Sequence, residues 1–112
     1  MTLKTGNLLA NVPAASAAED VTLLLATPHV RIERIVSHAH ASAPGFWYDQ
    51  HEAEWVMVVS GAAGLRIEGE GAVRRLGPGD YVVIPANVRH RVEWTAADQP
   101  TVWLAVHLRE SP

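Results

Sequence analysis

Apolar and polar residues alternate along most of the chain after residue 29, and this period of two predicts β-strands. The alternation defines about seven segments, at residues 30–37, 54–60, 62–69, 72–76, 81–84, 89–94 and 101–108. Turn-forming glycine, proline, asparagine and aspartate residues separate the segments at intervals of about 8–12 residues, which is typical of all-β sandwiches and barrels. The pattern therefore predicts an all-β fold.

The segment before residue 29 has a different pattern, which predicts one short helix at about residues 17–26. Ser16 and Glu19 have the spacing of a capping box, in which a hydroxyl and a carboxylate satisfy the first backbone N–H groups of a helix. Apolar residues follow at helical spacing, and Pro28 would end the helix because it disfavours the α conformation in the residue before it. We therefore expect an N-terminal arm and helix over about residues 1–28 and a barrel over about residues 29–110.

The composition predicts one globular domain spanning residues 1–112, because 48% of the 112 residues are hydrophobic. The net charge is −3 and Lys4 is the only lysine, so the chain offers no basic surface for nucleic acid. It has neither the run of roughly 18 apolar residues of a membrane span nor the pattern of a signal peptide. We expect a cytoplasmic protein without nucleic-acid or membrane partners.

The chain has no cysteine, which excludes disulfides, thiolate nucleophiles and thiolate metal ligands. A metal ion would therefore need imidazole, carboxylate, amide or water ligands. Such ligands suit Mn, Fe, Ni, Cu or Zn better than a structural zinc site built from cysteines.

Two polar residues stand on the apolar faces of predicted strands, and they are the first candidates for a functional site. Glu54 shares a face with Val56, and His90 shares a face with Val92 and Trp94. A carboxylate among hydrocarbon side chains is costly to bury unless a cation, a metal ion or hydrogen-bond donors compensate it. We therefore predict that the two strands face each other and direct Glu54 and His90 toward a shared interior site.

The stretch from Gly45 to Gly61 resembles the first sequence motif of the cupin family, which contains a glycine, a His-x-His pair, a glutamate and a second glycine. Six residues separate Glu54 from Gly61, as in that motif. The His-x-His pair itself is missing. Its positions hold, for the two spacings that the motif allows, Tyr48 and Gln50 or Trp47 and Asp49.

The stretch that begins at Gly79 resembles the second cupin motif, with Pro85 and His90 at the expected spacing. Asn87 stands where this motif usually has glycine, and asparagine tolerates the left-handed backbone conformation better than most residues. The two motifs together cover about residues 45–94. The resemblance implies a cupin double-stranded β-helix, also called a jelly-roll barrel, with its site inside the barrel.

The resemblance also implies ligands for a divalent metal ion, either Fe, Mn, Ni or Zn. Glu54 and His90 match the family's metal-binding positions, and Glu54 is alternatively a general base. Gln50 and His51 are the candidates to replace the missing His-x-His pair. Tyr48 is a candidate catalytic residue, because its hydroxyl could donate a hydrogen bond into the interior.

Other polar residues stay open as weaker candidates. His38 and His40 form the one His-x-His in the chain, but they precede the motif and are expected at the surface. Asp49 could replace a ligand, and His107 could line the interior from the last strand. His29 is expected in a surface turn.

The resemblance implies a metal-dependent enzyme that acts on a small molecule as an oxygenase, an isomerase or a decarboxylase. The alternative is a non-catalytic module that binds a small ligand or a metal ion, and a third possibility is a degenerate barrel that serves as a scaffold. Trp55 and Met57 face away from Glu54, and a large apolar outer face often marks association. We therefore also expect a homodimer.

Overall fold

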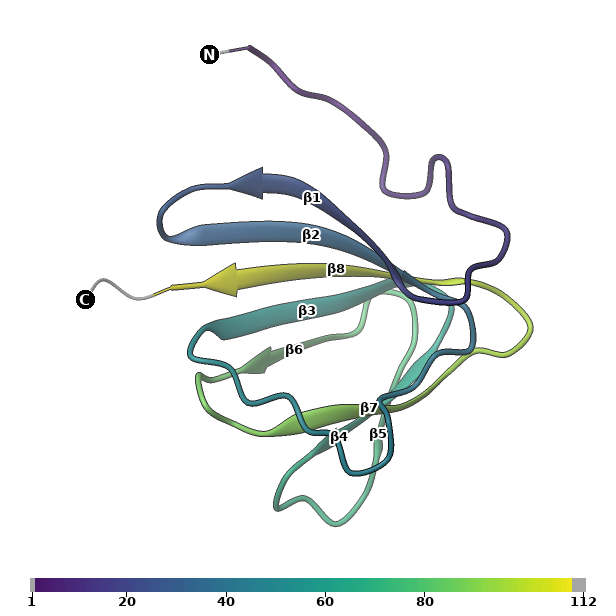
Figure 1. Cartoon of the computed structure of the whole chain (residues 1–112), viewed down its shortest axis with the longest axis vertical. Coiled ribbons are helices and arrows are strands. Elements are labelled where there is room, and N and C mark those ends of the chain that lie inside the picture. Colours follow the sequence, from purple (N-terminus) through teal and green to yellow (C-terminus); the bar gives the residue numbers. More distant parts are fainter. Residues whose placement is uncertain (1, 110–112) are drawn as a thin grey trace.

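Eight β-strands and no helix are found in residues 2–109, which are the residues that the computed structural model describes (Figure 1). The strands are β1 (Asp20–Ala26), β2 (Val30–Ser37), β3 (Ala53–Ser60), β4 (Ala63–Ile67), β5 (Arg74–Leu76), β6 (Tyr81–Ile84), β7 (His90–Thr95) and β8 (Thr101–Leu108). This architecture confirms the all-β fold class, and the seven predicted segments correspond to β2–β8. Nothing in the described part of the chain is a helix long and apolar enough to cross a membrane.

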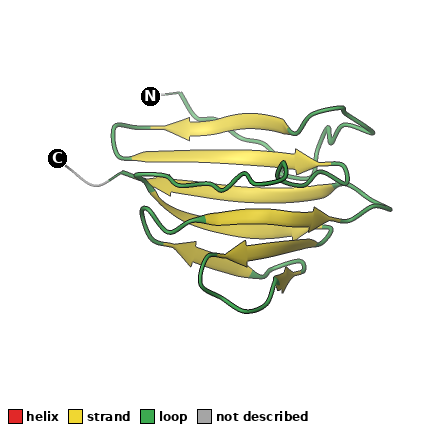
Figure 2. Ribbon diagram, turned by 60° about the horizontal axis from the view of Figure 1, so that its bottom comes forward, coloured by secondary structure: helices red, strands yellow, loops and turns green. Residues whose placement is uncertain are grey.

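The strands form two antiparallel sheets that face each other (Figure 1; Figure 2). The larger sheet has the order β1-β2-β8-β3-β6, and the smaller sheet has the order β5-β4-β7. Along β3, Glu54, Val56 and Val58 are buried while their neighbours are only partly buried, so the predicted inner face of this strand is correct. The main core consists of buried apolar side chains from both sheets, namely Val56, Val58, Ala63, Leu65, Leu76, Ile84, Trp103 and Ala105.

Strand β8 lies between β2 and β3, and its register aligns polar side chains on the inner face of the larger sheet. His107 of β8 pairs with Arg31 of β2 on one side and with Glu54 of β3 on the other. Side chains two residues apart in a strand share a face, so Glu33 lies on the same face as Arg31. Three neighbouring strands therefore bring ionisable groups into the space between the sheets.

The predicted helix at about residues 17–26 is wrong, because the segment forms strand β1. β1 pairs with β2 along its length, and a bulge between Leu23 and Leu25 shifts the register. A helix of this length is marginal by itself, whereas the edge of β2 offers β1 a ladder of backbone hydrogen bonds. Glu19 does not cap a helix, since its carboxylate accepts a hydrogen bond from the Ser37 hydroxyl instead.

The predicted face of Trp94 is also wrong, because a bulge in β7 reverses it. Val92 pairs with Leu65 of β4 but Trp94 pairs with Gly64, so β7 has one extra residue at this point. The indole of Trp94 lies over Gly64, where an added Cβ atom would be 2.1 Å from the indole Nε1. Trp94 therefore packs on the outer face of the smaller sheet, and Val92 keeps its predicted position on the inner face.

Candidate functional site

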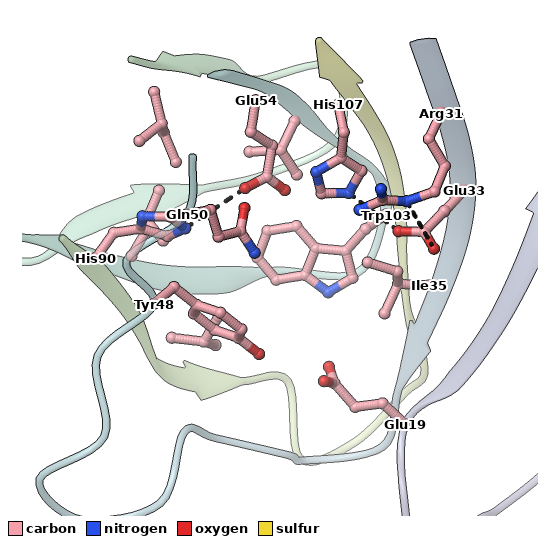
Figure 3. A pocket seen from close by; sticks show the side chains of 14 residues that line it. Glu19, Arg31, Glu33, Ile35, Tyr48, Gln50, Glu54, His90, Trp103 and His107 are labelled. Carbon is pink, nitrogen blue, oxygen red and sulfur yellow. Dashed lines mark hydrogen bonds and ion pairs between the residues drawn. The ribbon is translucent and has the colours of Figure 1, made fainter. Parts of the chain in front are cut away.

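A cavity of about 180 Å³ lies between the two sheets (Figure 3). Pockets for drug-sized ligands usually enclose about 300–1,000 Å³, so this cavity suits a smaller molecule. Aliphatic and aromatic groups form part of its wall. The rest of the wall carries carboxylate, guanidinium and imidazole groups, which belong to Glu19, Arg31, Glu33, Glu54, His90 and His107.

Glu54 and His90 meet at one wall of this cavity, where the sequence predicted a shared site. Glu54 stands near the start of β3, and His90 is the first residue of β7 in the opposite sheet. The Nε2 atom of His90 lies 3.4 Å from Oε1 of Glu54. Both side chains are buried, with exposed fractions of 7% for His90 and 11% for Glu54.

The hydrogen bonds of His90 determine which nitrogen faces the carboxylate. Its Nδ1 lies 3.0 Å from the carbonyl oxygen of Val88, so Nδ1–H donates to that oxygen and Nε2 faces Glu54. Burial by itself lowers the pKa of His90, but the hydrogen bond to Glu54, the bond to Val88 and the charge of Glu54 outweigh it. The pKa of His90 is therefore raised, and the pair favours holding a proton between its two members.

Tyr48 is held against His90 by backbone and ring contacts. The Tyr48 N–H donates to the His90 carbonyl oxygen at 2.7 Å, and the His90 N–H donates to the Tyr48 carbonyl oxygen at 3.1 Å. The two rings stack with centroids 5.3 Å apart and an angle of 21° between their planes. Burial, followed by the charges of Glu19 and Glu54, raises the pKa of Tyr48, so its hydroxyl stays protonated and can donate.

Gln50 lines the cavity next to the pair, whereas His51 does not. The Gln50 carbonyl oxygen accepts a hydrogen bond from the Asn87 N–H at 2.7 Å, which fixes the backbone at this point. Asn87 has a φ of 62°, the left-handed conformation that the motif's usual glycine would adopt. The side-chain Oε1 of Gln50 is buried and has no hydrogen-bond partner within residues 2–109. His51 and Asp49 are exposed and are not part of the cavity wall.

A second group of charges, which the sequence did not indicate, lies on the larger sheet. Nε2 of His107 is 3.0 Å from Oε1 of Glu33, and Oε2 of Glu33 is 3.5 Å from Nε of Arg31. The guanidinium of Arg31 also pairs with Glu52 at 3.1 Å. Of these residues only His107 was a candidate, because the face of β2 that carries Arg31 and Glu33 is the more polar one and resembled a solvent face.

Glu19 is a further cavity residue that no pattern in the sequence indicated. It precedes β1, and its carboxylate accepts a hydrogen bond from the Ser37 hydroxyl. The Ser37 oxygen in turn accepts a hydrogen bond from Nε1 of Trp103 at 3.2 Å. This chain of contacts holds Glu19 opposite Tyr48 in Figure 3. Its position depends on the pairing of β1 with β2, which the sequence did not predict.

The remaining histidines lie away from the cavity. His38 contacts the carbonyl oxygen of Pro13 through Nε2 at 2.7 Å, and Nδ1 of His40 accepts a hydrogen bond from the His38 N–H at 2.8 Å. Neither of these two side chains lines the cavity, and His29 is exposed. His38 therefore contacts both the N-terminal arm and His40.

The donors around Glu54 form a thin set for a metal ion. Among residues 2–109, no three His, Asp or Glu side chains are grouped closely enough to hold a metal. Glu54 and His90 are two strong donors, and the Gln50 amide oxygen is a weaker third, whereas protein metal sites usually have three or four protein ligands. These residues do not fit a tightly held metal ion, so no step of the chemistry below depends on one. The predicted metal site stays a prediction.

Similar structures share the fold of this chain. A protein from Ralstonia eutropha, whose assignment as a mannose-6-phosphate isomerase is provisional, is 52% identical, with a TM-score of 0.95 over 96% of this chain and 100% of its own. A cupin superfamily protein from Desulfitobacterium hafniense is 14% identical, with a TM-score of 0.76 over 98% of this chain and 95% of its own. An RmlC-like cupin from Methanocaldococcus jannaschii is 17% identical, with a TM-score of 0.72 over 97% and 93% of the two chains.

The two cupin structures confirm the double-stranded β-helix, and their low identity carries no further conclusion. No curated protein matches the chain. The family model described as a cupin domain matches residues 33–107, which include both motif stretches and all the cavity residues from Glu33 to His107. The chain therefore belongs to the cupin family.

Proposed function

We propose that this chain is a small-molecule enzyme of cupin type that transfers protons within its cavity, with Glu54 and His90 as the acid–base pair. The observation that carries the proposal is the buried contact of 3.4 Å between the two side chains at the wall of an interior cavity. A buried imidazole whose pKa is raised by a neighbouring carboxylate is typical of catalytic sites.

The reaction class that fits these groups is isomerisation of a small carbonyl compound. The Glu54 carboxylate takes a proton from the carbon next to the carbonyl group, and the bonding electrons move onto the carbonyl oxygen. The Tyr48 hydroxyl, which stays protonated, donates a hydrogen bond to that oxygen, and His90 stabilises the charge of the pair. The deprotonated carbon carries a hydroxyl group, and that hydroxyl passes its proton to the former carbonyl oxygen. Return of the first proton from Glu54 to the former carbonyl carbon then completes the isomerisation with no change in atoms or charge.

The Ralstonia eutropha protein supports the class of reaction, since an aldose–ketose isomerase moves a proton between neighbouring carbons. The cavity gives less support for a sugar phosphate. Arg31 is the one Arg or Lys side chain in the described cavity wall, and it is paired with Glu33 and Glu52. We therefore propose an isomerase without a phosphate-binding site.

The experiment that tests the proposal is deuterium exchange. Purified protein is incubated in deuterated water with a panel of small hydroxy- and amino-carbonyl compounds, and proton NMR follows loss of the signal next to the carbonyl group. We expect at least one compound to exchange faster with wild-type protein than with the Glu54→Gln variant. If the two proteins give the same exchange for every compound, the enzyme proposal fails.

The alternative is a non-catalytic small-ligand module, and the lost His-x-His pair favours it. Tyr48 and Gln50 occupy those positions and line the cavity. The cavity therefore keeps an aromatic and an amide group for contact with a small ligand, although both are weaker metal ligands than histidine. Saturable binding without exchange in the same panel would support this alternative.

We also propose a homodimer, and a cytoplasmic location stays a prediction. β1 is an edge strand, and its side chains Val21, Leu23 and Leu25 are 49–56% exposed. An exposed apolar edge strand offers a surface on which a second copy of the chain can pack. Sedimentation equilibrium of wild-type protein is expected to give twice the chain mass, and Leu23→Lys is expected to shift it toward one chain mass. A single chain mass for wild-type protein at high concentration would contradict the dimer.

A further inference from the structure

The charges of the cavity wall indicate the chemical class of its ligand. Three carboxylates, from Glu19, Glu33 and Glu54, line the cavity against one guanidinium, from Arg31. With neutral histidines this leaves two negative charges uncompensated, and a proton on His90 leaves one. Low-dielectric walls strengthen the field of such charges, so the cavity attracts cations and repels anions.

The guanidinium of Arg31 is not free to bind an anionic ligand. It lies 3.5 Å from Oε2 of Glu33 and 3.1 Å from Oε1 of Glu52, so two carboxylates already bind it. Recognition of a phosphate group depends on free arginine, lysine or backbone N–H donors. Within the described cavity wall no other arginine or lysine is present to supply them.

Two aromatic side chains, Tyr48 and Trp103, line the same cavity (Figure 3). Glu19 and Glu54 both act on the Tyr48 hydroxyl, since their charges contribute to its raised pKa after burial. Aromatic faces attract organic cations such as quaternary ammonium groups through their negative ring faces. Aromatic rings and carboxylates around one small cavity therefore both favour a positively charged ligand.

Two buried acceptor atoms in the cavity wall point to the same kind of ligand. Oε1 of Gln50 and Nδ1 of His107 have no hydrogen-bond partner within residues 2–109, and the His107 side chain is only 5% exposed. Because Nε2 of His107 faces Glu33, a proton on Nε2 leaves Nδ1 as an acceptor. An ammonium group supplies donors for such atoms, whereas a phosphate dianion supplies further acceptors.

We propose that the cavity binds a small organic cation, a protonated amine or a quaternary ammonium compound, and excludes phosphate esters. The proposal rests on the proposed function only in taking this cavity as the site. In the proposed reaction, the substrate is then a small carbonyl compound that carries an ammonium group.

Binding of three probes tests the charge preference: choline, the neutral carbon analogue of choline, and mannose 6-phosphate. The indole N–H signal of Trp103, which donates to Ser37 beside the cavity, reports occupancy by NMR. We expect choline to bind at least tenfold more tightly than its neutral analogue, whose shape is nearly the same. We expect mannose 6-phosphate to give no saturable change.

Two charge-removing variants separate the cavity field from the total charge of the protein. Glu19→Gln is expected to weaken choline binding about tenfold and to leave the neutral analogue unchanged. The matched control is Glu68→Gln, which removes a carboxylate paired with Arg89 at 2.8 Å on the surface, and it is expected to change neither affinity. Near-ultraviolet circular dichroism checks that both variants keep the native packing.

Equal binding of choline and its neutral analogue would overturn the proposal, and so would tighter binding of mannose 6-phosphate or no saturable binding of any probe. These failures differ from failure of the proposed function. Tight choline binding without deuterium exchange on any compound contradicts the enzyme and leaves the cation site intact. Exchange on an uncharged substrate, together with weak choline binding, contradicts the cation site and supports the enzyme.

Discussion

Replacing Glu54 with glutamine is expected to lower turnover at least a hundredfold on any substrate that the wild-type protein accepts. Glutamine keeps the shape of the side chain but cannot accept a proton, and it removes the negative charge beside Nε2 of His90. A positioned acid or base contributes about 10²–10⁴-fold to a proton-transfer reaction. The measurement is kcat and kcat/KM for the compound identified by deuterium exchange.

A catalytic role for Glu54 predicts that kcat falls, whereas a role only in substrate binding predicts that KM rises with kcat unchanged. The matched control is again Glu68→Gln, since it removes the same charge from an exposed position. Near wild-type kcat in the Glu54→Gln protein would contradict the role of Glu54 as base, and a large loss in the control would indicate a general effect of charge.

Replacing Gly61 with alanine is expected to lower the free energy of unfolding by about 3 kcal/mol or more. Gly61 directly follows β3 and has a φ of 91°, a conformation that L side chains rarely adopt. An added Cβ atom would also lie 2.7 Å from Cα of Thr101 and 2.8 Å from the carbonyl oxygen of Pro100. Both contacts are with backbone atoms, which cannot move aside without shifting β8. Urea unfolding of both proteins gives the difference.

Gly79→Ala is the control that separates the two causes. Gly79 has nearly the same conformation, with a φ of 89°, but no atom lies within 4 Å of an added Cβ. This variant should therefore lose only the cost of the backbone conformation, about 1–3 kcal/mol. Equal losses in the two variants would show that the close approach to β8 contributes nothing.

The main fold was predictable because the alternation of apolar residues is local information. In β3, Glu54 and Val56 occupy alternate positions, and both proved to face the interior. The same reasoning failed at Trp94, where a bulge in β7 reverses the faces. A bulge depends on the pairing of two strands, so the period of one strand does not reveal it.

The N-terminal segment shows why a short apolar run can be misread. Three consecutive leucines in β1 fit a helix and a strand equally well, and Ser16 with Glu19 supplied an apparent helix cap. The segment forms a strand because pairing with the edge of β2 gives it a ladder of backbone hydrogen bonds, whereas a helix of this length is marginal in water. Glu19 was interpreted as part of a helix cap, so its place in the cavity wall was not predicted.

The candidate site was predictable only in part. Glu54 and His90 were found because each stood on an apolar face and matched a family position, and the structure brings them to 3.4 Å. His51 was chosen by position alone, and its side chain is exposed. Arg31 and Glu33 were missed because ion pairs across β2 and β8 allow charged residues on an inner face, which makes that face resemble a solvent face.

An NMR titration of the His90 imidazole shows whether Glu54 and His90 share a proton inside the cavity. The protein is stripped of metal ions, and nitrogen-labelled wild type is compared with Glu54→Gln. We expect a pKa for His90 above the ordinary histidine value of 6.5, and we expect this pKa to fall when Glu54 is replaced because burial then dominates. A pKa at or below the ordinary value, unchanged by Glu54→Gln, would contradict the acid–base pair and the function proposed from it.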